Sequence, residues 1–388
     1  MKKIGILTYF WGHNPGTFLQ AYSTLNATKR YFPSYQIELI NCKLRRVRFR
    51  PSRYDFNIYR LQERYRNHTI YEKLIKLYLP KSPNSVVTFN YETLTKYILS
   101  QNYDLIIVGA DTVLEILPKH FSLGQVPIYW LPPKVKCKKI MFSASAGALT
   151  YDPLDKVYQK ALSDSINSFD LVGVRDDNTY NLIKRLGMKK DVPVQITPDP
   201  TFSIEIDYAH VERFLYRKQI KFEKPTIAIN LPESLSLCQK LVAYYQNKGI
   251  SVVLLGYGGY ASKRRECRFP MMSPLEWAGV HRYFSLEITD RFHGCIFALR
   301  NFTPVVAIDY EQRKHTASGL SKTYSLLKLY DMHNTNHVNT TKIGGFEEIM
   351  QVTDRALEFF DREYVERRTE ELRKDYISFM KKVGQLLA

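Results

Sequence analysis

Short apolar runs alternate with amphipathic helical patterns along most of the chain, and this alternation constrains the fold more than any other feature. The first run, Ile4–Thr8, is followed by Gly16–Arg30, in which apolar residues recur at helical spacing. Strands that alternate with helices form parallel sheets, because each helix crosses a face of the sheet before the next strand begins. The sequence therefore predicts an α/β fold.

Two such alternating sets follow one another, separated by a charged stretch that ends near Lys224. Further strands of the first set are predicted at Ile37–Ile40, Leu105–Val108, Ile140–Ser143, Leu171–Val174 and Val194–Ile196. Those of the second set are predicted at Thr226–Asn230, Ser251–Leu255, Tyr283–Ile288 and Val305–Ile308. A chain of 388 residues exceeds what one hydrophobic core usually supports. We therefore predict two doubly wound domains facing a central cleft, residues 1–205 and 206–388, the second ending in a long helical tail.

The net charge of +18 is concentrated in a basic, tyrosine-rich insertion at about 43–81. Its arginines are Arg45, Arg46, Arg48, Arg50, Arg53, Arg60, Arg64 and Arg66. A solvated basic surface and attraction to anionic lipid headgroups or lipid pyrophosphates both fit this composition. No helix-turn-helix, RNA-recognition or zinc-finger pattern accompanies the charge, so we predict no nucleic-acid partner.

The cysteines and the apolar runs indicate the cellular compartment in which the protein is expected. The five cysteines are scattered without paired spacing, which favours a reducing compartment over a disulfide scaffold or a zinc site. The N-terminal apolar run is interrupted at Trp11–Pro15, and no run approaches the length of a transmembrane helix. We expect a cytoplasmic protein, with peripheral contact at the inner face of the membrane as an open option, and neither metal nor cofactor.

The segment Ile288–Cys295, I-T-D-R-F-H-G-C, is the strongest local candidate for chemistry. It follows a predicted strand, and ligands of open α/β sheets bind outside the carboxyl ends of strands. Arg291 offers a planar fork for phosphate or carboxylate, His293 can give a proton near neutral pH, and Gly294 permits close backbone approach. A structural histidine beside a surface arginine is the alternative that this spacing leaves open.

Other predicted strand ends also carry polar or small residues. Arg175 follows the strand Leu171–Val174 and precedes acidic residues, which could either neutralise it or leave it to a ligand. Further candidates for ligand contact are Asn14, Gly16, Asp111, Ser143 and Asp199. Small residues leave room for a ligand, although turns and tight packing select the same residues.

Several motifs occur together in a fixed order. They are K-I-G-I-L-T-Y with N-x-G and L-Q-A-Y, then Y-D-L-I-I-V-G-A-D, S-A-S-A-G, V-R-D, D-P-T-F and T-D-R-F-H-G. In this order they resemble the polysaccharide pyruvyl transferase family, from Lys3 to about Asp309. The R-F-H-G element is the most specific. The family often has an aromatic residue after its G-x-D, where Leu114 stands nearby in this chain.

The resemblance implies a GT-B-like fold of two Rossmann-type domains, with the acceptor on the first domain and phosphoenolpyruvate on the second. Acceptors in the family are sugars of cell-wall or capsular polymers, which often receive a cyclic ketal. Arg291 and His293 match the family's donor-binding and catalytic pair, and Arg175 matches a further arginine. Gly294 is then expected beside the donor, whereas the five candidates at the other strand ends are expected to contact the acceptor.

The chemistry of phosphoenolpyruvate is consistent with this assignment. The donor carries a phosphate and a carboxylate and therefore needs more than one cation, and its methylene must be protonated by a general acid. We predict that Arg175 and Arg291 bind the anionic groups, that His293 is the acid or a phosphate ligand, and that Asp111 or Asp199 activates the acceptor. The acceptor could be linked to polyprenyl pyrophosphate. Two alternatives are a GT-B glycosyltransferase that uses a nucleotide sugar and a non-catalytic membrane-surface or polysaccharide-binding protein.

Overall fold

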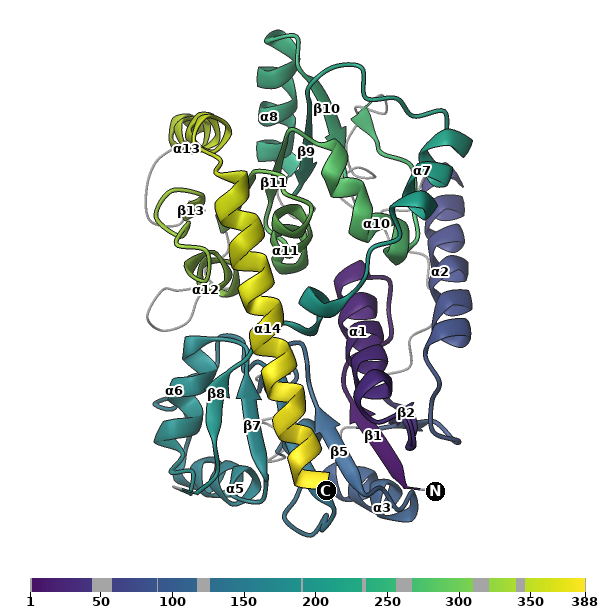
Figure 1. Ribbon diagram of the computed structural model, residues 1–388, viewed down its shortest axis with the longest axis vertical. Coiled ribbons are helices and arrows are strands. Elements are labelled where there is room, and N and C mark those ends of the chain that lie inside the picture. Colours follow the sequence, from purple (N-terminus) through teal and green to yellow (C-terminus); the bar gives the residue numbers. More distant parts are fainter. Residues whose placement is uncertain are drawn as a thin grey trace.

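The computed structural model describes residues 2–43, 58–88, 90–116, 126–189, 191–231, 235–255, 267–309, 321–339 and 346–387. Its two large parallel sheets have helices packed on their faces, and one such sheet lies in each half of the molecule (Figure 1). The predicted α/β fold is therefore confirmed. Among the helices of the described ranges, none is both long and apolar enough to cross a membrane.

The first sheet has six parallel strands in the order β2-β1-β5-β6-β7-β8. The strands are β1 (Lys3–Leu7), β2 (Gln36–Leu39), β5 (Leu105–Val108), β6 (Lys138–Ala144), β7 (Leu171–Val174) and β8 (Val194–Ile196). Every strand predicted for the first set is present. The central strands β5 and β7 are fully buried, as expected of parallel strands covered on both faces. The chain changes direction across the sheet between β1 and β5, which is where doubly wound folds bind ligands.

The helices of this half begin at clear sequence signals. They are α1 (Pro15–Tyr31), α2 (Ile58–Tyr78), α3 (Tyr91–Ser100), α5 (Lys156–Ile166) and α6 (Asp177–Arg185). Asn14 caps α1 and Asp176 caps α6, each accepting a hydrogen bond from a backbone N–H of the first turn. Of the predicted basic insertion, 44–57 lie outside the described residues, and α2 forms most of the remainder. A short pair, β3 (Cys42–Lys43) and β4 (Val86–Val87), flanks it.

The second sheet has five parallel strands in the order β10-β9-β11-β12-β13. They are β9 (Thr226–Asn230), β10 (Ser251–Leu254), β11 (Leu286–Thr289), β12 (Val305–Asp309) and β13 (His337–Asn339). The surrounding helices are α7 (Tyr208–Arg217), α8 (Leu235–Asn247), α10 (Pro274–Val280), α11 (Phe292–Arg300), α12 (Lys322–Lys328) and α13 (Phe346–Glu358). The strand predicted from Tyr283 begins at Leu286, because His281–Tyr283 form a turn of 3-10 helix.

The C-terminal helix α14 (Arg362–Leu387) runs from the second half back to the first (Figure 1). Its buried residues Tyr376, Phe379 and Val383 belong to the same apolar cluster as Ile4 and Phe18 of the first half. The tail predicted as the end of the second domain thus also covers the first sheet. The boundary at residue 205 stays a prediction, and the 3-10 turn η2 (Pro200–Ser203) lies close to it.

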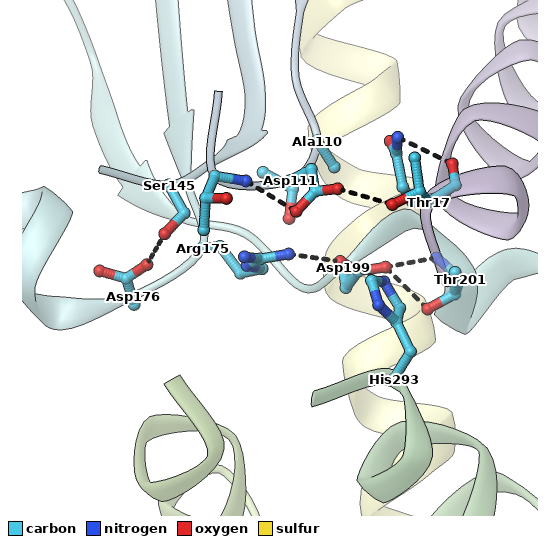
Figure 2. A network of polar contacts seen from close by, with 12 residues as sticks. Thr17, Ala110, Asp111, Ser145, Arg175, Asp176, Asp199, Thr201 and His293 are labelled. Atoms are coloured by element: carbon cyan, nitrogen blue, oxygen red, sulfur yellow. Dashed lines mark hydrogen bonds and ion pairs between the residues drawn. The ribbon is translucent and has the colours of Figure 1, made fainter. Parts of the chain in front are cut away.

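The two halves bring the carboxyl ends of their strands toward one another. Helix α1 follows β1, Asp199 follows β8, and α11 follows β11, and the first residues of these segments meet between the sheets (Figure 2). Trp277 of α10 packs in the cluster that contains Phe18 of α1, which fixes the halves against each other. This meeting point contains most of the residues predicted for the site.

Candidate active site

Asp199 is the centre of a polar network that joins both halves (Figure 2). Its side chain is only 1% exposed, and its Oδ2 lies 3.1 Å from Arg175 Nη1 and 3.6 Å from His293 Nε2. Its Oδ1 accepts hydrogen bonds from the Thr201 backbone N–H at 3.0 Å and from the Thr201 hydroxyl at 2.7 Å. The carboxylate therefore holds an arginine of the first half and a histidine of the second.

The pKa of Asp199 is lowered below its ordinary value of 3.8. Burial alone raises this pKa, but His293 at 3.6 Å, the charge of Arg175 and the Thr201 hydroxyl together outweigh burial. Asp199 is consequently ionised at neutral pH. His293 and Arg175 face a fixed negative charge.

Arg175 lies just past the end of β7 and has one edge available for a ligand. Its guanidinium stacks on the ring of Phe292, 4.3 Å from the centroid, and its side chain is 3% exposed. Nη1 binds Asp199, whereas Nε and Nη2 have no hydrogen-bond partner among the residues that the structure describes. These two nitrogens form one edge of the planar group, and such an edge binds a carboxylate or phosphate through two parallel hydrogen bonds.

A small cavity lies beside Arg175, between the two halves. Its polar lining includes Arg175, Asp199, Lys322 and Ser325, and the ring of Phe292 closes one side. Lys322 opens α12, whose first turn is anchored because the Thr323 hydroxyl donates to both carboxylate oxygens of Asp309, at 3.0 and 2.9 Å. Arg175 and Lys322 thus give the cavity two cationic side chains on separate elements. Asp176 and Asp199 give it two carboxylates, and Phe292 forms an apolar wall.

His293 lies in the first turn of α11, directly against the first turn of α1. A Cβ atom added at Gly16 would lie 2.2 Å from His293 Nδ1, so only glycine leaves room for the imidazole. Asn14 Oδ1 accepts a hydrogen bond from the Gly16 N–H at 2.9 Å. The structure therefore places Asn14 and Gly16, predicted on the acceptor side, beside the predicted acid.

Arg291 and Gly294 flank the histidine and differ in what surrounds them. The Arg291 side chain is 36% exposed, and its Nε lies 3.1 Å from Asp290 Oδ1. A Cβ at Gly294 would lie 2.8 Å from Thr289 Oγ1, so this glycine permits α11 to pack closely on β11. Arg291 is thus partly exposed, whereas Gly294 has a role in packing.

Asp111 and Ser143 are placed differently. Asp111 follows β5 at a positive φ of 78°, is partly exposed, and its Oδ2 lies 3.4 Å from the Thr17 hydroxyl. Ser143 has no exposed surface, and its hydroxyl donates to the Thr197 carbonyl at 3.4 Å. The structure brings Asp111 to the cleft but keeps Ser143 within the sheet. Nearby, Ser145 donates to Asp176, the cap of α6, at 2.6 Å.

The family model for polysaccharide pyruvyl transferase matches residues 14–312. The chain belongs to the polysaccharide pyruvyl transferase family. The matched span includes Arg175, Asp199, Arg291 and His293, so the network around Asp199 lies inside the part of this transferase that defines the family. No curated protein sequence matches the chain.

Solved structures with similar folds are GT-B enzymes, which confirms the predicted fold. UDP-GlcNAc 2-epimerase from Methanocaldococcus jannaschii, in complex with UDP-GlcNAc and UDP, is 11% identical with a TM-score of 0.53, over 96% of this chain and 100% of that one. HepE of Anabaena, in complex with UDP and glucose, is 12% identical with a TM-score of 0.53, over 100% and 99%. Sucrose-phosphate synthase from Thermosynechococcus elongatus is 11% identical with a TM-score of 0.52, over 100% and 98%.

Sequence analysis missed Lys322, which lies beyond the span that the family model matches. No strand is predicted directly before it in the sequence, and no motif marks it. The one usable signal in the sequence was Ser321, because serine is a good N-cap residue. It predicts that α12 begins there but does not by itself indicate a functional site. For metal binding, the described residues contain no group of three or more histidine, cysteine or acidic side chains suitable as ligands.

Proposed function

We propose that this family member transfers the enolpyruvyl group of phosphoenolpyruvate to a sugar of a bacterial surface polysaccharide or its lipid-linked precursor, forming a pyruvate ketal. The observation that carries the proposal is the buried edge of Arg175, which has two hydrogen-bond donors directed away from Asp199. A buried guanidinium edge without an acceptor is costly unless a ligand satisfies it. An anionic donor would satisfy it.

Phosphoenolpyruvate has two anionic groups, and the cleft offers two separate cationic sites. Arg175 and Lys322 line the small cavity, whereas Arg291 is the N-cap residue of α11, has a side chain that is 36% exposed, and is not part of that lining. We assign one anionic group of the donor to the Arg175 edge with Lys322, and the other to Arg291. Separate sites hold the donor in one orientation, which lowers the entropic part of the barrier.

His293 is assigned as the general acid. It gives a proton to the methylene carbon, which becomes a methyl group, while the enol carbon becomes electrophilic. The ionised Asp199 at 3.6 Å and the backbone of Gly16 on the opposite side fix the position of the ring. Asp199 is bound by Arg175, Thr201 and His293 and thus serves to position these groups.

The acceptor-activating base is then better assigned to Asp111 than to Asp199. Asp111 is partly exposed and lies by the first turn of α1, which also carries Asn14 and Gly16. It would take the proton of a sugar hydroxyl as the hydroxyl oxygen bonds to the enol carbon. A second hydroxyl of the same sugar then bonds to that carbon and gives its proton to His293, which lost its own proton in the first step. Phosphate leaves with the electron pair of its C–O bond and takes the proton held by Asp111, and the ketal closes.

A thermal-shift titration with phosphoenolpyruvate tests the donor. A ligand that binds only the native state raises stability by about 2.7 kcal/mol at a hundredfold excess over its Kd. We expect a saturable shift in the wild type that Arg291→Ala weakens and Arg175→Ala abolishes. A shift with UDP and none with phosphoenolpyruvate would instead favour a glycosyltransferase. Phosphate release from phosphoenolpyruvate, measured with a panel of nucleotide-linked, lipid-linked and polymeric sugars, then identifies the acceptor.

A further inference from the structure

Helix α2 has one solvent-facing side on which cationic and apolar side chains occur together. We call this the basic face of α2 and define it as Tyr65, Arg66, Lys73, Lys76 and Leu77. These positions recur at helical spacing and therefore lie on one side of the helix. Tyr65 is 59% exposed and Leu77 is 65% exposed, and the three cationic residues between them are also exposed.

The opposite side of α2 is fixed to the protein. Tyr71 and Ile75, together with Leu79 directly after the helix, are buried in the apolar cluster of the first half. His68 Nδ1 lies 2.8 Å from Nε2 of His13, in the loop that leads into α1. Because one side is packed, the basic face is a rigid surface rather than a fluctuating segment.

Within the described part of the chain, the cations of the basic face are not held in ion pairs. Among the carboxylates that the structure describes, none forms an ion pair with Arg66, Lys73 or Lys76. One acidic residue, Glu72, is exposed at the margin of this side of α2. The sequence that precedes the helix, Lys43–Arg53, adds further positive charge. The surface therefore fits a partner that is negatively charged over a wide area.

We propose that the basic face of α2 docks this transferase on an anionic lipid bilayer. Lysine and arginine are attracted to anionic headgroups, and exposed tyrosine and leucine at the two margins enter the boundary between headgroups and acyl chains. A bilayer explains both components, whereas a soluble polyanion would use only the cations. The inference concerns a surface outside the cleft, and it holds whatever the donor is.

Docking at this surface would also place the cleft near the membrane. His13, which contacts α2, is followed directly by Asn14 and Gly16, and Gly16 contacts His293. The basic face and the candidate acid are therefore linked through one short stretch of chain, from His13 to Gly16. A sugar presented on a lipid carrier could then reach the cleft without release from the membrane; this consequence rests on the proposed function.

Co-sedimentation with vesicles tests the proposal with the full-length protein. The vesicles contain phosphatidylcholine alone or phosphatidylcholine with 30% phosphatidylglycerol, a fraction of roughly the size that gives a strong surface potential. Each basic residue near an anionic surface contributes about fivefold in affinity. We expect the triple variant Arg66→Glu, Lys73→Glu, Lys76→Glu to bind the anionic vesicles at least about one hundredfold more weakly than the wild type.

A matched variant controls for net charge. Lys156, Lys240 and Lys381 are exposed on α5, α8 and α14, and changing all three to Glu alters the net charge by the same amount. This variant should retain binding, and both variants should keep the wild-type thermal shift with phosphoenolpyruvate. Equal loss of binding in both variants, no loss in the α2 variant, or equal binding to neutral vesicles would each overturn the proposal. So would binding to duplex DNA that the α2 variant loses while vesicle binding persists.

Discussion

The contact between Gly16 and His293 allows a sharp prediction for Gly16→Ala. The added Cβ would lie 2.2 Å from His293 Nδ1, 2.5 Å from Cγ and 2.9 Å from Cβ, whereas ordinary contact begins at 3.4 Å, so the ring must retreat by about 1.2 Å. Gly16 is in the first turn of α1 and has no positive φ, so alanine suits its backbone. The strain therefore falls on the position of the imidazole.

A displacement of about 1 Å at a reacting group can cost on the order of a hundredfold in rate. We expect Gly16→Ala to lower kcat by that factor, and to lower the free energy of unfolding by about 1–3 kcal/mol, because the added methyl group overlaps the ring and Cβ of His293. The assay is phosphate release from phosphoenolpyruvate with the acceptor found in the screen. Gly384→Ala is the control, because its nearest neighbour, Phe32 Cε1, would be 4.0 Å from the new Cβ.

A double-mutant cycle shows whether the effect acts through the histidine. In a His293→Ala background, Gly16→Ala should have almost no further effect on kcat, because the side chain that it displaces is gone. If the two substitutions instead lowered kcat independently, so that their effects multiplied in the double variant, the reasoning would be refuted. Wild-type kcat for Gly16→Ala alone would do the same.

Three further predictions concern charge. The pKa of Asp199 is lowered, so its ionised form contributes stability that is complete above its ordinary value and is lost as pH falls toward the lowered one. Urea unfolding should show that Asp199→Asn costs about 3–5 kcal/mol at pH 7 and removes part of the acid sensitivity below pH 4. Burial lowers the pKa of Lys139 to about 8, so its buried charge lowers the free energy of unfolding below that pH. The free energy of unfolding should therefore rise between pH 8 and 10.5, and urea unfolding of Lys139→Met should show no such rise. Because cationic side chains neutralise the donor in our proposal, EDTA should leave phosphate release unchanged; loss of activity that Mg²⁺ restores would contradict this.

Much of the fold could be predicted from the sequence because parallel strands buried on both faces read as continuous apolar runs. Leu105–Val108 and Leu171–Val174 were predicted with the bounds that the structure gives them. The start of β11 was less predictable, because Tyr283 and Phe284 are apolar enough to extend a strand but instead end a 3-10 turn. The course of α14 over the first sheet could not be predicted, since helical periodicity shows which side is apolar but not what it covers.

The candidate site was predictable where its residues follow strands. Arg175, Asp199 and His293 lie at strand ends or helix starts, and the opposing sheets bring them together. The separate roles of these residues were not predictable, because they depend on distances between the two halves. Asp199 holds Arg175 and His293 in place, and Gly16 leaves room for the imidazole. Lys322 could not be predicted from the sequence, because its position in the same cavity as Arg175 depends on how α12 packs.

The central claim is that the carbon skeleton of phosphoenolpyruvate, and not its phosphate, moves to the acceptor. Donor labelled with ¹⁴C in the pyruvyl carbons and with ³²P in the phosphate tests this in one reaction, with wild type and His293→Gln side by side. The account predicts ¹⁴C in the glycan, an equal amount of free ³²P-phosphate, and loss of both in the variant. Phosphorus label in the glycan, or transfer of a sugar from a UDP-sugar with no transfer of ¹⁴C, would contradict it.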